Sequence, residues 1–222
     1  MAALVVALAL GIIFWDSPLL WPLKLLVVMM HESGHALAAL LVGGSVQQVI
    51  IDAQEAGACV SRLPSGALAK VAVYSAGYLG SAMAGAAMML ATFRLRLRRW
   101  VLAASCVWLA FMGAAYAGDL FTIAFCFSTA LVLAFCARYL PDGAVEWMNL
   151  FIAAFSSLYV LFDLRDDLWH AGTRASSDAA LLANLTWVPA VVWAALWSVF
   201  SVAILGLAAW RSVERRRFAL AM

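Results

Sequence analysis

Runs of apolar residues recur along almost the whole chain and leave only short polar segments between them. Several runs are long enough to cross a bilayer, which takes about 20 helical residues. Only 12% of the 222 residues are charged, against about 25% in a typical soluble domain. We therefore expect one domain, 1–222, with the fold class of an all-α integral membrane protein, a polytopic bundle of about six to seven transmembrane helices. The apolar segments cover residues 1–15, 19–42, 67–93, 100–117, 119–137, 147–163 and 187–210.

Two clusters of basic residues indicate how the helices are oriented. One follows the third apolar segment, at residues 94–99, and the other follows the last, at residues 211–217. Lys and Arg are enriched in cytoplasmic loops, and an even number of segments separates the clusters. We expect a multi-pass protein of a cell membrane, a bacterial inner membrane, with its C-terminus in the cytoplasm. The clusters are read as determinants of topology beside the lipid bilayer, and no nucleic-acid partner is expected.

The second apolar segment, expected as a helix at about 19–42, contains His31-Glu32-Ser33-Gly34-His35. Ionisable residues at membrane depth usually mark a functional site. Residues four apart lie on one helix face, with Cβ atoms about 5–6 Å apart, so both imidazoles can bind one Zn²⁺. Glu32 is rotated away by roughly 100° per residue and can take a proton from a zinc-bound water. We predict that His31 and His35 are metal ligands and that Glu32 is catalytic.

A third zinc ligand is needed, because catalytic sites use three protein ligands and keep one position open. Asp163 ends the sixth apolar segment, within a helix expected at about 147–167, and is the first acid of that run. We predict that Asp163 is this ligand, with Asp166, Asp167 and Asp142 as alternatives. His170 lies in a polar loop and is the weaker candidate.

Two weaker patterns concern packing and connections. Partial alternation around a glycine-containing turn predicts a possible short β-hairpin at 45–62, with an ordinary connecting loop as the alternative. Such a hairpin could offer an edge to an extended peptide. Small residues at helical spacing between Ser75 and Ala86 allow close packing, which we expect against the HExxH helix. Ser177 or a neighbouring residue is expected to cap a short helix, followed by a C-terminal helix at about 187–210.

The motif and its surroundings resemble the M50 family of intramembrane zinc metalloproteases, the site-2 proteases, in particular the M50B-like branch. The matching residues are His31-Glu32-Ser33-Gly34-His35, then Gly43-Gly44 before the hairpin-like stretch, and further along Ser157-Leu158-Tyr159, residues 163–167 and Ser177-Asp178-Ala179. The resemblance implies that His31 and His35 bind zinc, that Glu32 activates water and that Asp163 completes the ligands. One feature departs from the family: site-2 proteases generally supply the acid from an Asn-Pro…Leu-Asp-Gly motif, of which this chain has only Leu140-Pro141-Asp142-Gly143.

The predicted function is that of an intramembrane zinc metalloendopeptidase acting on transmembrane or membrane-proximal substrates, with a membrane protein or peptide as partner. The alternative is a non-proteolytic membrane protein, either an inactive M50 relative that binds partners or a metal transporter. A transporter would spread polar residues along a path through several helices, whereas here they gather at one site. An inactive relative usually loses the Glu or a His, and this chain keeps all three. The sequence predicts no particular oligomeric state.

Overall fold

A computed structural model describes residues 2–169 and 177–220, with side chains described through residue 164 and from 177 to 212. Within these ranges the chain is mainly helical, and a 3₁₀ turn, η1 (Pro18–Leu20), precedes the second helix. Two strands follow that helix. The helices are α1 (Ala2–Ile13), α2 (Trp21–Leu41), α3 (Ala67–Phe93), α4 (Arg98–Ala115), α5 (Leu120–Tyr139), α6 (Asp142–Trp169), α7 (Asp178–Thr186) and α8 (Ala190–Leu220), and the strands are β1 (Ser45–Ile51) and β2 (Gly57–Arg62).

The predicted fold class is confirmed, because all seven apolar segments fall in helices and the chain is an all-α polytopic membrane protein. Among the described residues, five stretches are long and apolar enough to cross a membrane. They are Pro18–Leu41, Ala67–Phe93, Leu120–Tyr139, Asp142–Leu164 and Ala190–Ser212. Helix α1 is shorter, with 12 residues. Helix α4 has 18 residues but begins with two arginines, which lower its mean hydropathy.

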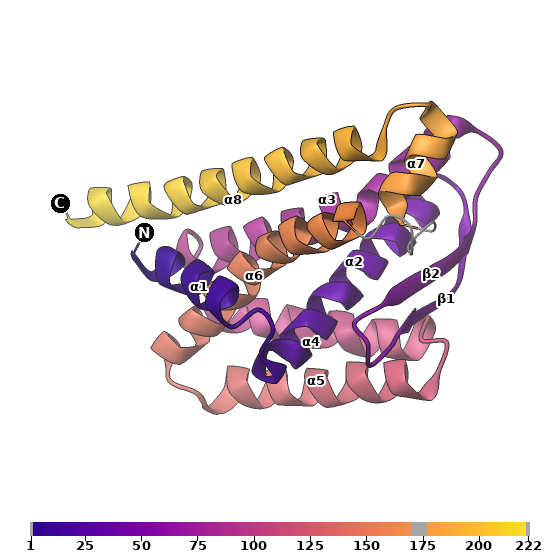
Figure 1. The fold of residues 1–222 in the computed structure, drawn as a ribbon. Coiled ribbons are helices and arrows are strands. Elements are labelled where there is room, and N and C mark those ends of the chain that lie inside the picture. The colour runs from indigo at the N-terminus through magenta and orange to yellow at the C-terminus, as the bar shows by residue number, and fades with distance from the viewer. Residues whose placement is uncertain (1, 170–176, 221–222) are drawn as a thin grey trace.

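The helices pack in layers around α2 and α3 (Figure 1). Helices α4 and α5 lie side by side along one side of the molecule, and α8 runs along the opposite side against α3. Helix α6 lies between them and contacts α3, α8 and α1. The two chain ends that Figure 1 marks lie at the same end of the bundle.

A network of ion pairs brings the start of α4 to the start of α6. Arg98 contacts Asp142 at 2.6 Å and Glu146 at 2.7 Å, and Arg99 contacts Asp142 at 2.7 Å. Helices α4 and α5 therefore form a hairpin whose two open ends lie at the same level. This is the arrangement expected if the basic loop before α4 and the turn before α6 share one membrane face.

Helices α2 and α3 approach closely because glycines line their contact. A Cβ at Gly34 would overlap the backbone carbonyl of Ala76, and a Cβ at Gly80 would lie 3.2 Å from the Cα of Gly34. Close backbone approach through small residues is a common way for helices to associate in lipid. The expected packing of the small residues of α3 against the HExxH helix is thus what the structure has.

The predicted hairpin is confirmed, with β1 and β2 antiparallel and Val49 opposite Cys59. The outer edge of β1 is not open. The Val49 N–H donates to the Tyr116 carbonyl at 2.7 Å, and the Gly118 N–H donates to the Val49 carbonyl at 2.9 Å. The Ile51 N–H donates to the Thr122 hydroxyl at 2.9 Å. The segment that joins α4 to α5 therefore covers this edge.

The hairpin folds back along α2 instead of leaving the bundle (Figure 1). At its turn, the Trp21 indole N–H donates to the Ala53 carbonyl at 2.9 Å, and Lys24 pairs with Glu55 at 3.0 Å. Trp21 and Lys24 belong to the first turns of α2, so the hairpin runs beside a membrane-spanning helix. Non-helical backbone is tolerated at membrane depth only where protein buries it or where it lines a water-filled cavity. Residues of β2, among them Gly57 and Cys59, line a cavity of the bundle.

Candidate metal centre

Two imidazoles of α2 converge on one point. His31 and His35 are one helical turn apart, and their Nε2 atoms are 2.9 Å from each other. The Nδ1 atom of His35 lies 2.7 Å from the Val73 carbonyl of α3. A carbonyl oxygen can only accept, so Nδ1 carries the hydrogen and Nε2 is left as an acceptor or metal ligand. Bonds of this kind fix the tautomer and ring orientation of metal-binding histidines.

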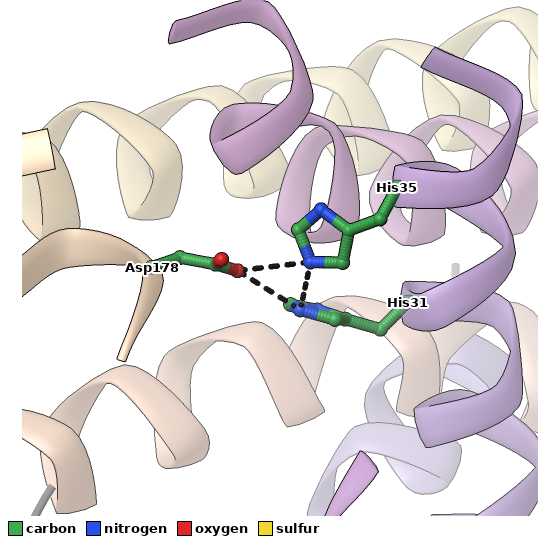
Figure 2. A group of neighbouring side chains, drawn as sticks. All are labelled: His31, His35 and Asp178. Carbon is green, nitrogen blue, oxygen red and sulfur yellow. Dashed lines mark hydrogen bonds and ion pairs between the residues drawn. The ribbon is translucent and has the colours of Figure 1, made fainter. Parts of the chain in front are cut away.

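Asp178 brings a carboxylate oxygen to the same point (Figure 2). Its Oδ2 atom is 3.1 Å from Nε2 of His31 and 3.1 Å from Nε2 of His35. Asp178 is the first residue of α7, whose N-cap is Ser177 as predicted, with the Ser177 hydroxyl accepting from the Ala180 N–H. Burial raises the pKa of the Asp178 carboxyl, but the adjacent imidazoles outweigh this effect and hold its pKa below the ordinary value.

These three residues fit a zinc ion. Ligand atoms of a tetrahedral zinc site with bonds of about 2.0–2.1 Å lie roughly 3.3 Å apart, close to the 2.9–3.1 Å separations here. Two imidazoles and one carboxylate are also a donor set that catalytic zinc sites use. In the part of the chain that the structure describes, His31, His35 and Asp178 are the group of such side chains that could hold a metal ion.

Glu32 lies beside this group but points to a different neighbour. It is buried against β2, where a Cβ at Gly57 would come within 2.5 Å of its Oε1 atom. Glycine at position 57 therefore leaves the room that the carboxyl group occupies. Glu32 lines the same cavity as His31 and His35, and it stays outside the group of three, as the rotation along the helix predicts.

Asp178 takes the place that the sequence analysis gave to Asp163. Asp163 of α6 lines the cavity, but its Oδ2 accepts a hydrogen bond from the Tyr78 hydroxyl at 2.6 Å, and it is not part of the group with His31 and His35. The reason lies in the tertiary packing. Helix α7 packs back on α3 and α8, with Ala179 buried, and this packing places its first residue, Asp178, beside the two imidazoles.

The other predicted alternatives do not take that place among the described residues. Asp142 pairs with Arg98 and Arg99 at the start of α6 and does not line the cavity. The side chains of Asp166 and Asp167, and the whole of His170, lie outside the described residues.

One sequence signal could have pointed to Asp178. It follows a helix-capping serine and precedes the apolar run Ala179-Ala180-Leu181-Leu182, so the first turn of that helix had to lie against the protein interior. From the sequence we predict the ligand in a long apolar segment, whereas Ser177-Asp178-Ala179 enters only as a helix cap and as part of the family resemblance.

The site opens into a cavity of about 510 Å³ among α2, α3, α6, α7 and the hairpin. Its polar lining comes from His31, His35 and Asp178, the candidate metal-binding group, together with Glu32 and Asp163. The hairpin turn and β2 also line it, with Glu55, Gly57, Cys59 and Ser61. The cavity thus brings β2 beside Glu32 and the candidate metal-binding group.

The sequence matches the family model described as Peptidase M50B-like over residues 1–208, a range that contains every residue of this site. Searches among curated proteins and among solved structures gave no match.

Proposed function

Because the chain belongs to the Peptidase M50B-like family, we propose that it is an intramembrane zinc metalloendopeptidase that cleaves transmembrane or membrane-proximal substrates. The observation that carries this proposal is the convergence of His31, His35 and Asp178 beside the buried Glu32 in one cavity of the helix bundle. An inactive relative that only binds partners needs no such convergence. A transporter needs metal-binding groups along a path through the bundle, whereas this group lies at a single point.

The residues divide the work of peptide hydrolysis. His31, His35 and Asp178 would hold the zinc ion, which when bound polarises the scissile carbonyl and makes water a better nucleophile near neutral pH. Glu32 takes a proton from the attacking water and returns it to the leaving amine. The Val73 carbonyl keeps His35 in the tautomer that leaves Nε2 free to bind metal.

Strand β2 supports a way to hold the substrate. The N–H and carbonyl of Val49 point away from β2, toward the segment that joins α4 to α5. In an antiparallel pair, the N–H and carbonyl of the residue directly opposite then point away from β1. Cys59 therefore presents its N–H and carbonyl at the outer edge of β2. Gly57, opposite Ile51, does the same, because the Ile51 N–H bonds Thr122 on the far side. An extended substrate segment can add to this edge, beside Glu32.

Substrate cleavage requires local unwinding, because a helix hides its carbonyls in i→i−4 hydrogen bonds. We expect preferred substrates to carry helix-breaking residues, such as Gly or Pro, near the scissile bond.

The test uses the purified protein in detergent and two synthetic peptides of about 20 residues, one of Leu and Ala and one with a central Gly-Pro pair. We expect the protein to cleave only the Gly-Pro peptide. A chelator should abolish this activity, and added zinc should restore it. The Glu32→Gln variant keeps zinc and loses about 10²–10⁴-fold in kcat, the usual contribution of general acid–base catalysis.

Two results would contradict the proposal. Zinc-loaded protein that cleaves neither peptide, nor a set of natural membrane segments, would favour the inactive relative. Equal cleavage by wild type and Glu32→Gln would show that the activity does not come from this site.

A further inference from the structure

Tyr78 of α3 lies at the junction of four helices and touches the metal-binding group. Its ring meets that of His31 edge to face, with centroids 4.5 Å apart and an interplanar angle of 82°. On its other side it stacks on Trp197 of α8, at 5.0 Å and 28°. The Tyr78 hydroxyl donates to Asp163 of α6 at 2.6 Å. The side chain is almost completely buried, with 2% exposed.

The two histidines are oriented by different means. His35 donates its Nδ1 hydrogen to the Val73 carbonyl, which fixes its ring. Among the described residues, no carbonyl bond of this kind reaches His31, and the Tyr78 ring is what lies against its imidazole. Edge-to-face aromatic pairs have a preferred geometry, so a fixed Tyr78 ring restricts the rotation of His31.

Asp163 in turn fixes Tyr78. A separation of 2.6 Å falls in the range of hydrogen bonds from a hydroxyl to a carboxylate, which are about twice as strong as neutral ones. With Trp197 stacked on one face and Asp163 bonded at the hydroxyl, the phenol ring is held at both its face and its tip. The Asp163 carboxylate is thus bonded to Tyr78, and it is Tyr78 whose ring contacts His31.

We propose that Tyr78 and Asp163 form a positioning pair for the zinc ligand His31, in which Asp163 holds the Tyr78 hydroxyl and the Tyr78 ring holds the imidazole. Asp163 acts through Tyr78 and is not itself a ligand. This inference rests on the proposed function only in requiring zinc at the site. Partners that orient metal ligands typically contribute 10–100-fold in metal affinity.

The experiment measures zinc affinity by competition with a chromogenic chelator, without any substrate. We expect Tyr78→Leu, which removes the ring, to weaken zinc binding about 10–100-fold. Tyr78→Phe and Asp163→Leu each break the hydrogen bond but keep the aromatic ring at position 78. Each should therefore weaken zinc binding less than Tyr78→Leu does, and the two should weaken it by similar factors. The double variant Tyr78→Phe/Asp163→Leu should be no weaker than the single variants, because both remove the same interaction. Asp163→Asn keeps an acceptor oxygen and should restore most of the affinity.

Two controls separate positioning from ligation and from general loosening. Tyr74→Phe removes a hydroxyl from the same cavity wall and should bind zinc like the wild type. Cobalt(II) can replace zinc, and its visible spectrum reports the ligand set. The spectrum should be unchanged in Tyr78→Phe and Asp163→Asn, and altered in Asp178→Ala.

Several outcomes would overturn the inference. A cobalt spectrum of Asp163→Asn that changes as in Asp178→Ala would make Asp163 a ligand. Additive losses in the double variant, or wild-type affinity in Tyr78→Leu, would show that the pair does not position His31. Absence of zinc from the wild type would overturn both this inference and the proposed function. Zinc binding with the expected pattern, but no cleavage, would support the pair and count against the peptidase alone.

Discussion

At the scale of single residues, the candidate metal centre depends on glycines as much as on the three side chains that could hold an ion. Gly77 of α3 faces both histidines, and a Cβ there would overlap the Nε2 atoms of His31 and His35. A Cβ at Gly57 would likewise overlap the carboxyl group of Glu32. The glycines allow two backbones to approach a cluster of polar side chains that must also keep space for an ion and a substrate.

Gly77→Ala should therefore abolish zinc binding while the protein still inserts and folds. The added methyl group falls where the two Nε2 atoms lie, so the imidazoles must rotate away from Asp178. Zinc per chain, measured in purified protein, checks this expectation. Gly206→Ala in α8 is the matched control, because a Cβ there meets nothing within 4 Å. It should keep zinc and gain up to about 1 kcal/mol from helix propensity. Full zinc content in Gly77→Ala would show that the site is not where the structure places it.

Local sequence predicted the histidines and Glu32 because their relation depends only on the helical period. Asp178 could not be found in the same way. Its position depends on α7 folding back against α3 and α8, a contact between residues far apart in the chain. Asp163 satisfied the local criterion, an acid at the end of an apolar run, but that criterion does not distinguish a ligand from a residue that bonds Tyr78.

At the scale of elements, alternation predicted the hairpin but not its path. The path is set by two contacts at the start of α2, the Trp21 bond to Ala53 and the Lys24–Glu55 pair, and by the Val49 bonds that cover the outer edge of β1. None of these has a local signature. Within residues 2–169 and 177–220 they leave the second edge of β2 without a backbone partner, and β2 lines the cavity that contains Glu32.

Cys59→Pro tests this edge directly. Proline removes the outward N–H and leaves the β1–β2 ladder intact, so we expect kcat/KM to fall about tenfold, the worth of one hydrogen bond, with zinc unchanged. Cys59→Ala removes only the thiol and should cleave normally. Ala58→Pro removes a ladder bond instead and should disrupt the hairpin, which hydrogen exchange of β1 would detect. If Cys59→Pro cleaves as well as Cys59→Ala, the substrate does not add to β2 at this position.

At the scale of the whole molecule, apolar runs and basic clusters predicted the membrane layout. The Arg98 and Arg99 ion pairs with Asp142 agree with it, because they bring the starts of α4 and α6 to one level. The small residues of α3 predicted its packing on α2, but the other helices that meet around the site were not predictable, since lipid-facing and protein-facing apolar residues look alike in sequence.

The layout predicts opposite membrane faces for the two ends of α3. Basic loops stay in the cytoplasm, so residue 96, exposed in the basic loop, should be cytoplasmic and residue 65, exposed before α3, should be external. In a variant with its four cysteines replaced by alanine, Ser65→Cys should react with an impermeant maleimide in intact spheroplasts, and Arg96→Cys only after permeabilisation.

Trp187→Cys is a control for the second half of the chain, because Trp187 is 93% exposed and follows α7 at the end of the bundle where α3 begins. It should label together with Ser65→Cys. If only Arg96→Cys is labelled in intact spheroplasts, the protein has the opposite orientation in the membrane. Equal labelling of residues 65 and 96 before permeabilisation would mean that α3 does not cross the membrane, and the cavity that contains Glu32 would then lie outside the bilayer.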